Sequence, residues 1–218
     1  TGVQTCALPI SFPNIIPQPD GVTKLYYRGR RNLKATLDTP ARDHGLDQAT
    51  DIMLSGGSAG GIAAYFAADW VRDHAQTLAP GLQKYKVMST SGYFNSDPDL
   101  SDVDVYKQRC HDAMVLHNGF AGVNANCLQQ EPRNWMCGCS DIHYPYIESP
   151  LFVHNAVLDS YDLWWHYLNN SAVTDATWIL CWGNVSLCSN AQMVTLNKRA
   201  TRIMTVMQRA AVYHKAGN

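Results

Sequence analysis

The stretch LSGGSAGGIAA, which runs from Leu54 to Ala64, places Ser58 among four glycines between two apolar segments. The residues before it, 50–55, form a short apolar run of the kind that predicts a buried β-strand. The residues after it, 59–73, predict a helix, because apolar residues recur on one face at intervals of three and four. The chain therefore passes from strand to helix through a turn built mainly of glycine around Ser58.

This turn fits the pattern Gly56-x-Ser58-x-Gly60, which indicates a nucleophile elbow when it links a strand to a helix. A nucleophilic serine there lies on a sharp, strained bend, and glycine on each side lets strand and helix approach. We expect the N–H groups of Ala59 and Gly60 to form an oxyanion hole. The alternatives are a plain glycine-rich turn or a phosphate-binding loop. A Walker loop would need a following lysine, and the glycine spacing does not fit a dinucleotide-binding motif.

The composition indicates one globular domain, since 46% of the 218 residues are hydrophobic, 16% are charged and the formal net charge is -1. Lys and Arg form no run of the kind with which proteins bind nucleic acid or an anionic membrane. No apolar stretch approaches the roughly 20 residues that a membrane-spanning helix requires. We therefore expect a neutral or small-molecule ligand and a monomeric protein.

Other segments alternate between strand and helix patterns. Such alternation predicts an α/β fold with a doubly wound, mostly parallel sheet in a single domain. Residues 11–21, rich in Pro and Asn, are expected to be irregular, and residues 118–149 are interpreted as an irregular, cysteine-rich insertion held by crosslinks. The expected strands are 24–27, 86–88 and 150–157. The expected helices are 31–47, 103–116, 161–168 and 191–213, and Pro40 is expected to shorten or divide the first of them.

The first ten residues, TGVQTCALPI, are similar to the in-frame translation of a common sequencing-library adapter. Thr1–Ile10 is therefore treated as an artefact, and the predicted domain covers residues 11–218. Without Cys6 the cysteine count is even. The remaining cysteines all lie in the second half of the chain: Cys110, Cys127, Cys137, Cys139, Cys181 and Cys188.

These cysteines are interpreted as forming disulfides in a secreted or extracellular protein. An endolysosomal location is the alternative. Two Asn-x-Ser sequons, at Asn169 and Asn184, favour the same compartment. We expect Cys181 to pair with Cys188, which would close a short loop. A zinc site is the alternative for Cys137-Gly138-Cys139, but a single Cys-x-Cys pair is a weak zinc motif.

The residues around Ser58 are similar to the GCSAGG-type elbow of the pectin acetylesterase and Notum family of secreted carboxylesterases, with Gly57 in place of the usual cysteine. The resemblance continues in YRG at 27–29, in STSGYF at 89–94 and in SPLFVHNAVLDS at 149–160. Thr90 stands where the family often has Asp. The resemblance implies an α/β-hydrolase-like fold and a serine esterase that uses no metal and no organic cofactor.

The resemblance implies that Asp159, in the last of these segments, is the catalytic acid. The chain order supports the same choice, because a carboxylate just past a buried parallel strand and after the serine fits the order Ser, Asp, His. Two alternatives remain open. Asp159 could only cap the helix that follows it, and Asp162 could be the acid instead.

The family pattern further implies a histidine in a Cys-x-x-His-Cys segment after the last long helix and a GGGWC-type segment before the elbow. Neither segment occurs in this sequence. We therefore expect a chain that is incomplete at both ends, with a signal peptide outside it, and that holds nucleophile and acid without the base. His214 is interpreted as a surface residue and His154 as a buried residue of its strand.

The expected function is that of a serine carboxylesterase that removes a small acyl group, such as acetyl, from a small-molecule or polysaccharide ester such as pectin. Without its base, the chain as it stands should be weakly active or inactive. One alternative is a Notum-like enzyme that removes a lipid from a protein. The other is an inactive secreted binding protein on the same scaffold.

Overall fold

The computed structural model describes residues 5–6, 14–17, 20, 24–168 and 176–213. A parallel three-stranded sheet in the order β4-β5-β6 consists of Asp51–Gly57, Lys84–Thr90 and Leu151–His154. Its register pairs Gly57 with Thr90 and Thr90 with His154, so the carboxyl ends of all three strands meet at one edge. The expected α/β fold with a parallel sheet is confirmed.

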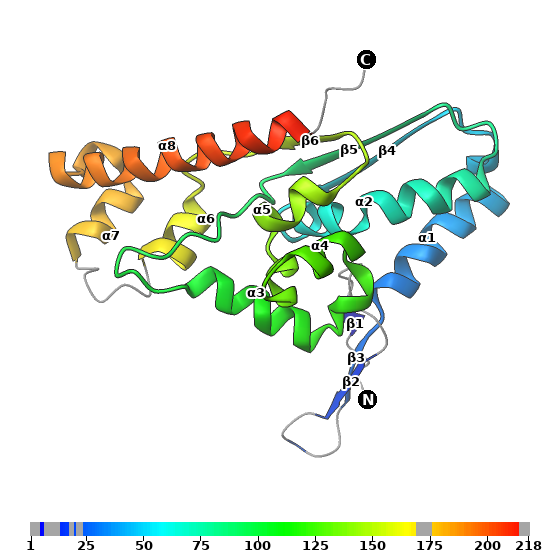
Figure 1. The fold of residues 1–218 in the computed structure, drawn as a ribbon, viewed down its shortest axis with the longest axis horizontal. Helices are drawn as coiled ribbons and strands as arrows, with labels where there is room; N and C mark the ends of the chain where they lie inside the picture. The colour runs from blue at the N-terminus through cyan, green and yellow to red at the C-terminus, as the bar shows by residue number, and fades with distance from the viewer. Residues whose placement is uncertain (1–4, 7–13, 18–19, 21–23, 169–175, 214–218) are drawn as a thin grey trace.

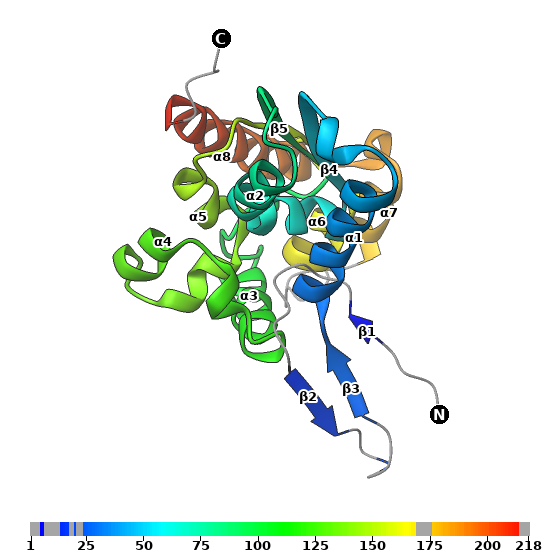
Figure 2. The same cartoon turned by 90° about the vertical axis from the view of Figure 1, so that its right-hand side faces the viewer.

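A second, small sheet projects from the body of the molecule in both views (Figures 1 and 2). Its order is β1-β3-β2, from β1 Thr5–Cys6, β2 Asn14–Pro17 and β3 Lys24–Tyr27. The α-helices are α1 Gly29–Asp43, α2 Ala59–Leu78, α3 Val105–Leu116, α4 Ala125–Gln130, α5 Ser140–His143, α6 Ser160–Asp162, α7 Ala176–Gly183 and α8 Asn190–Tyr213. The other helical segments are 3₁₀ turns η1 Leu46–Gln48, η2 Gly119–Gly122, η3 Asn134–Gly138, η4 Tyr144–Tyr146 and η6 Val185–Leu187, and a π-helix at Leu163–Leu168.

The main core lies between the sheet and α2. Tyr65 of α2, Val87 of β5 and Ile203 of α8 are buried members of the same apolar cluster. Most strand side chains that point the other way are exposed, and Met53 and Phe152 are exposed by 63% and 65%. Burial of one face of α2 thus fixes that helix against the sheet, and with it the position of the turn at residue 58.

Several elements differ from the expectations. Residues 14–17 were expected to be irregular, but they pair antiparallel with β3, which supplies the hydrogen bonds that the short segment lacks by itself. The helix α7 was not predicted from the sequence. Pro40 neither ends nor divides α1, which continues to Asp43 and is followed by Gly45 at a φ of 78°.

All six cysteines assigned to disulfides are paired. Cys181 bonds to Cys188 as expected, and the other pairs are Cys110–Cys139 and Cys127–Cys137. The last two hold residues 118–149, which fold into short helices rather than irregular chain. Cys137 and Cys139 therefore have no free thiolate for the zinc alternative. Among the helices that the structure describes, none has the length and apolar character to cross a membrane.

Candidate active site

Ser58 occupies the turn between β4 and α2. Its backbone has a φ of 53° and a ψ of -120°, a combination that residues other than glycine rarely adopt. The N–H of Ser58 donates to the carbonyl of Thr90 at 2.9 Å, which ties the turn to the end of β5. Ser58 is exposed rather than packed in the interior. An exposed, strained serine between a strand and a helix has the local geometry of a nucleophile elbow.

Glycines around Ser58 allow backbone segments to lie in direct contact. A Cβ atom on Gly56 would come within less than 3.0 Å of the carbonyl of Gly60, and a Cβ on Gly92 would meet the backbone of Gly61 as closely. A Cβ on Gly60 would meet no described atom within 4 Å, so close approach does not explain this glycine. The roles of Gly61 and Gly92 could not be predicted from the sequence, because their contact joins α2 to the loop after β5.

The amino end of α2 presents backbone amides beside Ser58. The helical ladder begins with Ile62 N–H donating to the carbonyl of Ser58 at 3.0 Å, so Ala59 and Gly60 lie ahead of it. Both residues are exposed. The helix is 20 residues long, and its dipole adds positive potential at this end. These amides can donate to a negatively charged oxygen next to Ser58.

Asp159 follows β6, whose carboxyl end lies at the same edge of the sheet as that of β4, because both strands run parallel to β5. The strands of a sheet lie about 4.8 Å apart, so β4 and β6, with β5 between them, are roughly 10 Å apart. Asp159 is half-buried and caps α6, with Oδ1 accepting from Tyr161 N at 2.9 Å and Asp162 N at 3.0 Å. Both bonds use the same oxygen, so the cap leaves Oδ2 for another donor.

Asp162, the rival acid, belongs to a buried charged network. Its Oδ2 accepts from Arg199 of α8 at 2.5 Å, and its Oδ1 lies 2.9 Å from Nδ1 of His166. Only 5% of the Asp162 side chain and 3% of the Arg199 side chain are exposed. Both carboxylate oxygens of Asp162 are thus occupied in holding α6 and the π-helix to α8.

Replacing Asp162 by Asn is expected to lower the free energy of unfolding by about 3 to 5 kcal/mol, because Arg199 would stay buried without its counter-charge. Urea denaturation followed by circular dichroism measures the effect. The matched control is Asp43→Asn, which removes an ion pair with Arg42 at the surface and should leave stability almost unchanged. Equal losses in the two variants would contradict a structural role for the network.

The described histidines have other roles. His154 was expected to be a buried strand residue, but it is exposed, because it is the last residue of β6 and points away from the core. His143 is buried in the insertion, and burial lowers its pKa to about 4. His166 is engaged by Asp162. His214 lies outside the described residues. None of the described histidines forms a hydrogen bond with Ser58 or Asp159.

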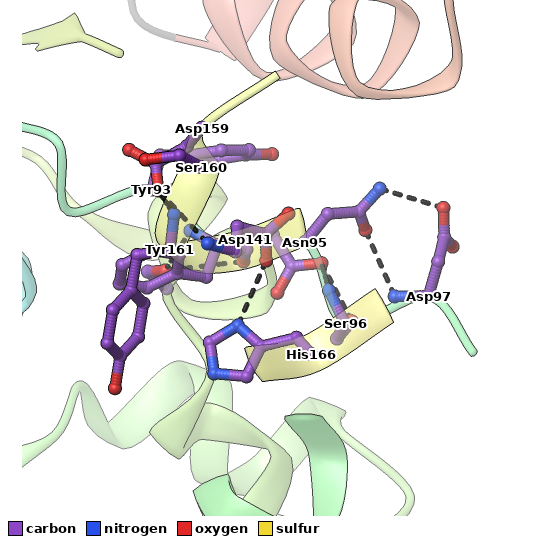
Figure 3. Close-up of polar contacts among 12 residues, drawn as sticks. Tyr93, Asn95, Ser96, Asp97, Asp141, Asp159, Ser160, Tyr161 and His166 are labelled. Atoms are coloured by element: carbon purple, nitrogen blue, oxygen red, sulfur yellow. Dashed lines mark hydrogen bonds and ion pairs between the residues drawn. The ribbon is translucent and has the colours of Figure 1, made fainter. Parts of the chain in front are cut away.

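Asn155 and Asp141, which were not singled out from the sequence, hold the loop after β5, and Figure 3 shows Asp141 near Ser96 of that loop. Asn155, just past β6, accepts from Tyr93 N at 3.1 Å. Asp141 of α5 accepts from both the N–H and the hydroxyl of Ser96, at 2.9 and 2.7 Å. Burial raises the pKa of Asp141 to about 6. Asn155 lay inside the predicted strand 150–157, and only the end of β6 at His154 shows that it belongs to the loop, whereas Asp141 carried no signal.

An apolar cavity of about 140 Å³ lies beside Asp159. Leu158 and Ser160, the neighbours of Asp159, contribute to its wall together with Trp178 and Trp182 of α7. Its size is comparable to that of a cavity that holds one benzene molecule. In the part of the chain that the structure describes, no group of three or more His, Cys, Asp or Glu residues is arranged to hold a metal ion.

Known proteins share sequence and fold with this chain. Over 186 residues the chain is 27% identical to pectin acetylesterase 5 of Arabidopsis thaliana, covering 85% of this chain and 42% of that protein. Over 145 residues it is 29% identical to palmitoleoyl-protein carboxylesterase notum1 of Xenopus laevis, covering 62% of this chain and 30% of that protein. The chain thus spans less than half the length of these curated relatives.

Among solved structures, the Wnt deacylase Notum from Drosophila has a TM-score of 0.68 at 18% identity, covering 92% of this chain and 54% of that one. This likeness shows the fold. The pectinacetylesterase family model matches residues 3–218, and the match includes most of Thr1–Ile10, whose adapter origin stays a prediction. Since almost the whole chain matches that model, the protein belongs to the pectinacetylesterase family.

Proposed function

We propose that the protein is a serine carboxylesterase that removes a small acyl group, such as acetyl, from a hydroxyl of a carbohydrate such as pectin. The observation that carries this proposal is the exposed Ser58, held at a positive φ at the carboxyl end of a parallel strand. Strain of this kind is typical of functional residues. Membership of the pectinacetylesterase family supports the same chemistry.

In the proposed reaction the Ser58 hydroxyl oxygen attacks the ester carbonyl carbon while a histidine takes the hydroxyl proton. The amides of Ala59 and Gly60 donate to the oxyanion that forms. When the intermediate collapses, the bond to the alcohol oxygen breaks and the histidine returns the proton to that oxygen. Water then attacks the acyl-serine in the same way and releases the carboxylic acid.

We propose that this histidine comes from a part of the protein outside these 218 residues. Asp159 would accept a hydrogen bond from it and hold the imidazole in the tautomer that can take the serine proton. The Oδ2 of Asp159, which the helix cap leaves unused, supports this assignment over Asp162, whose oxygens are both occupied.

A small acyl group is proposed in preference to a lipid because the chain belongs to the pectinacetylesterase family. The cavity of about 140 Å³ is lined by the neighbours of Asp159 and not by Ser58, so its volume does not set the length of the acyl group. Removal of a fatty acyl group from a protein, which the name of the Xenopus relative describes, is the alternative function. The apolar lining of the same cavity, mainly Leu and Trp, is the observation that favours it.

A fluorophosphonate probe tests the proposal. In a form of the protein that carries the proposed histidine, it should label Ser58, as peptide mass spectrometry would show, and acetyl nitrophenyl ester should be hydrolysed faster than long-chain esters. The control is Ser55→Ala, which removes a serine of β4 and should leave labelling unchanged. Faster hydrolysis of long-chain esters would favour the lipid alternative. An unlabelled Ser58 in the folded protein would overturn the esterase proposal and favour the inactive binding protein.

We further propose that the protein passes through the secretory pathway, an oxidising compartment that suits its three disulfides. Asn184 begins an exposed Asn-Val-Ser sequon, so it should carry an N-linked glycan in a eukaryotic host. On a denaturing gel, treatment with a peptide N-glycosidase should shift the mobility of Asn184→Gln by one glycan less than that of the wild type. Asn197→Gln, at an exposed Asn without a sequon, should change nothing. A glycan-free Asn184 in secreted protein would contradict this prediction.

A further inference from the structure

Two exposed aromatic rings belong to the helical segments that follow the proposed acid. Tyr161 is 52% exposed and Trp165 is 41% exposed, and their ring centroids are 6.1 Å apart at an interplanar angle of 41°. They are four residues apart on α6 and the π-helix, and so project from the same side. A π-helix is rare and is frequently found at functional sites.

The Tyr161 ring is held in place from behind. It packs against Phe94 and His166, which are both buried, at centroid distances of 6.0 and 5.7 Å. Figure 3 shows the Tyr161 ring beside His166, which is itself anchored through Asp162. The backbone N–H of Tyr161 also donates to Asp159. The ring is therefore pre-organised, so little conformational entropy would be lost when a ligand binds to it.

A positive charge flanks the rings. The guanidinium carbon of Arg109, on α3, lies 6.0 Å from the centre of the Trp165 ring. The neighbouring carboxylates have other partners: Asp104 pairs with Lys107, and Asp112 accepts from Gln108. No carboxylate among the described residues forms an ion pair with Arg109. Its charge therefore remains available to a ligand on the Trp165 ring.

We propose that Tyr161, Trp165 and Arg109 form a platform that binds a sugar chain carrying carboxylate groups, next to the proposed reaction centre. The proposal rests on the proposed function, because the platform is placed by its contact with Asp159. A sugar ring presents a face of C–H bonds, which the negative face of an aromatic ring attracts. A guanidinium recognises a carboxylate with two parallel hydrogen bonds.

The same features argue against other occupants. A fatty acyl chain needs a closed apolar pocket, whereas these rings are open to water and have a charge beside them. Exposed aromatic rings with a cation could also contact an anionic membrane, but one arginine on a chain with a formal net charge of -1 gives little attraction to such a surface. An open surface beside the site suits a polymer that extends past the ester that is cleaved.

Binding of oligogalacturonic acid to the 218-residue chain, measured by isothermal titration calorimetry, tests the platform without requiring catalysis. Trp165→Ala is expected to weaken binding by about tenfold. Arg109→Gln is expected to weaken it by about threefold and to remove most of its dependence on salt. A neutral oligogalactan should bind more weakly than the acidic oligomer to the wild type, and equally well to wild type and Arg109→Gln.

The matched control is Arg133→Gln, since Arg133 lies 5.9 Å from the Trp135 ring in a pair of the same kind elsewhere. This variant should bind like the wild type, and circular dichroism checks that each variant is folded. Unchanged binding in folded Trp165→Ala and Arg109→Gln would overturn the platform. Binding of the chain to phosphatidylserine vesicles without binding to oligogalacturonic acid would also overturn it. Failure of the esterase proposal would instead appear as an unlabelled Ser58.

Discussion

Asp159→Asn is expected to lower kcat by about 10⁴ in a form of the protein that carries the proposed histidine, with little change in KM. An amide in place of the carboxylate cannot stabilise the imidazolium and favours the wrong tautomer of the imidazole. Asparagine caps a helix about as well as aspartate, so the bonds from Tyr161 N and Asp162 N can persist. The variant therefore separates the role of Asp159 in catalysis from its role as a cap.

Two measurements make this prediction specific. Hydrolysis of a small acetyl ester gives kcat and KM, and urea denaturation shows that Asp159→Asn is as stable as the wild type. Asp162→Asn provides the comparison, because it should lose stability while the folded fraction keeps its kcat. The opposite pattern, with kcat lost only in Asp162→Asn, would mean that Asp162 is the acid and that Asp159 is only a cap.

The part of the site that is local in sequence could be predicted from the sequence. Strand, turn and helix around Ser58 lie within 51–78, where each step follows from glycine spacing and from the apolar face of the helix. The disulfide Cys181–Cys188 is local in the same sense, with a separation of seven residues. Local patterns of this kind depend on backbone sterics and on one buried face, so tertiary packing changes them little.

The parts that depend on long-range contacts could not be predicted. The contact between Gly61 and Gly92, the bond from Asn155 to Tyr93 and the burial of Asp162 against Arg199 each join distant segments. The sequence left Asp159 and Asp162 as alternatives, because both follow the same strand. In the structure Arg199 of α8 occupies Asp162, a long-range contact that supports Asp159 as the proposed acid.

Gly56→Ala is expected to abolish the elbow. The added Cβ would lie less than 3.0 Å from the carbonyl of Gly60, and both partners are backbone atoms that cannot rotate away. The first turn of α2 would have to move by about 1 Å or more, and a displacement of that size at a reacting group typically costs about a hundredfold in rate. We therefore expect labelling of Ser58 by a fluorophosphonate to fall by at least that factor, and stability to fall by about 3 kcal/mol.

Gly60→Ala is the matched control, because it adds the same methyl group two residues beyond Ser58. The new Cβ would meet no described atom within 4 Å and the N–H of residue 60 would remain, so labelling should continue. Stability should rise by about 0.5 to 1 kcal/mol, since alanine loses less backbone entropy than glycine within a helix. Labelling rates and urea denaturation of the two variants measure this difference. If Gly56→Ala were labelled as fast as Gly60→Ala, the contact between β4 and α2 would not be what holds Ser58 in its strained conformation.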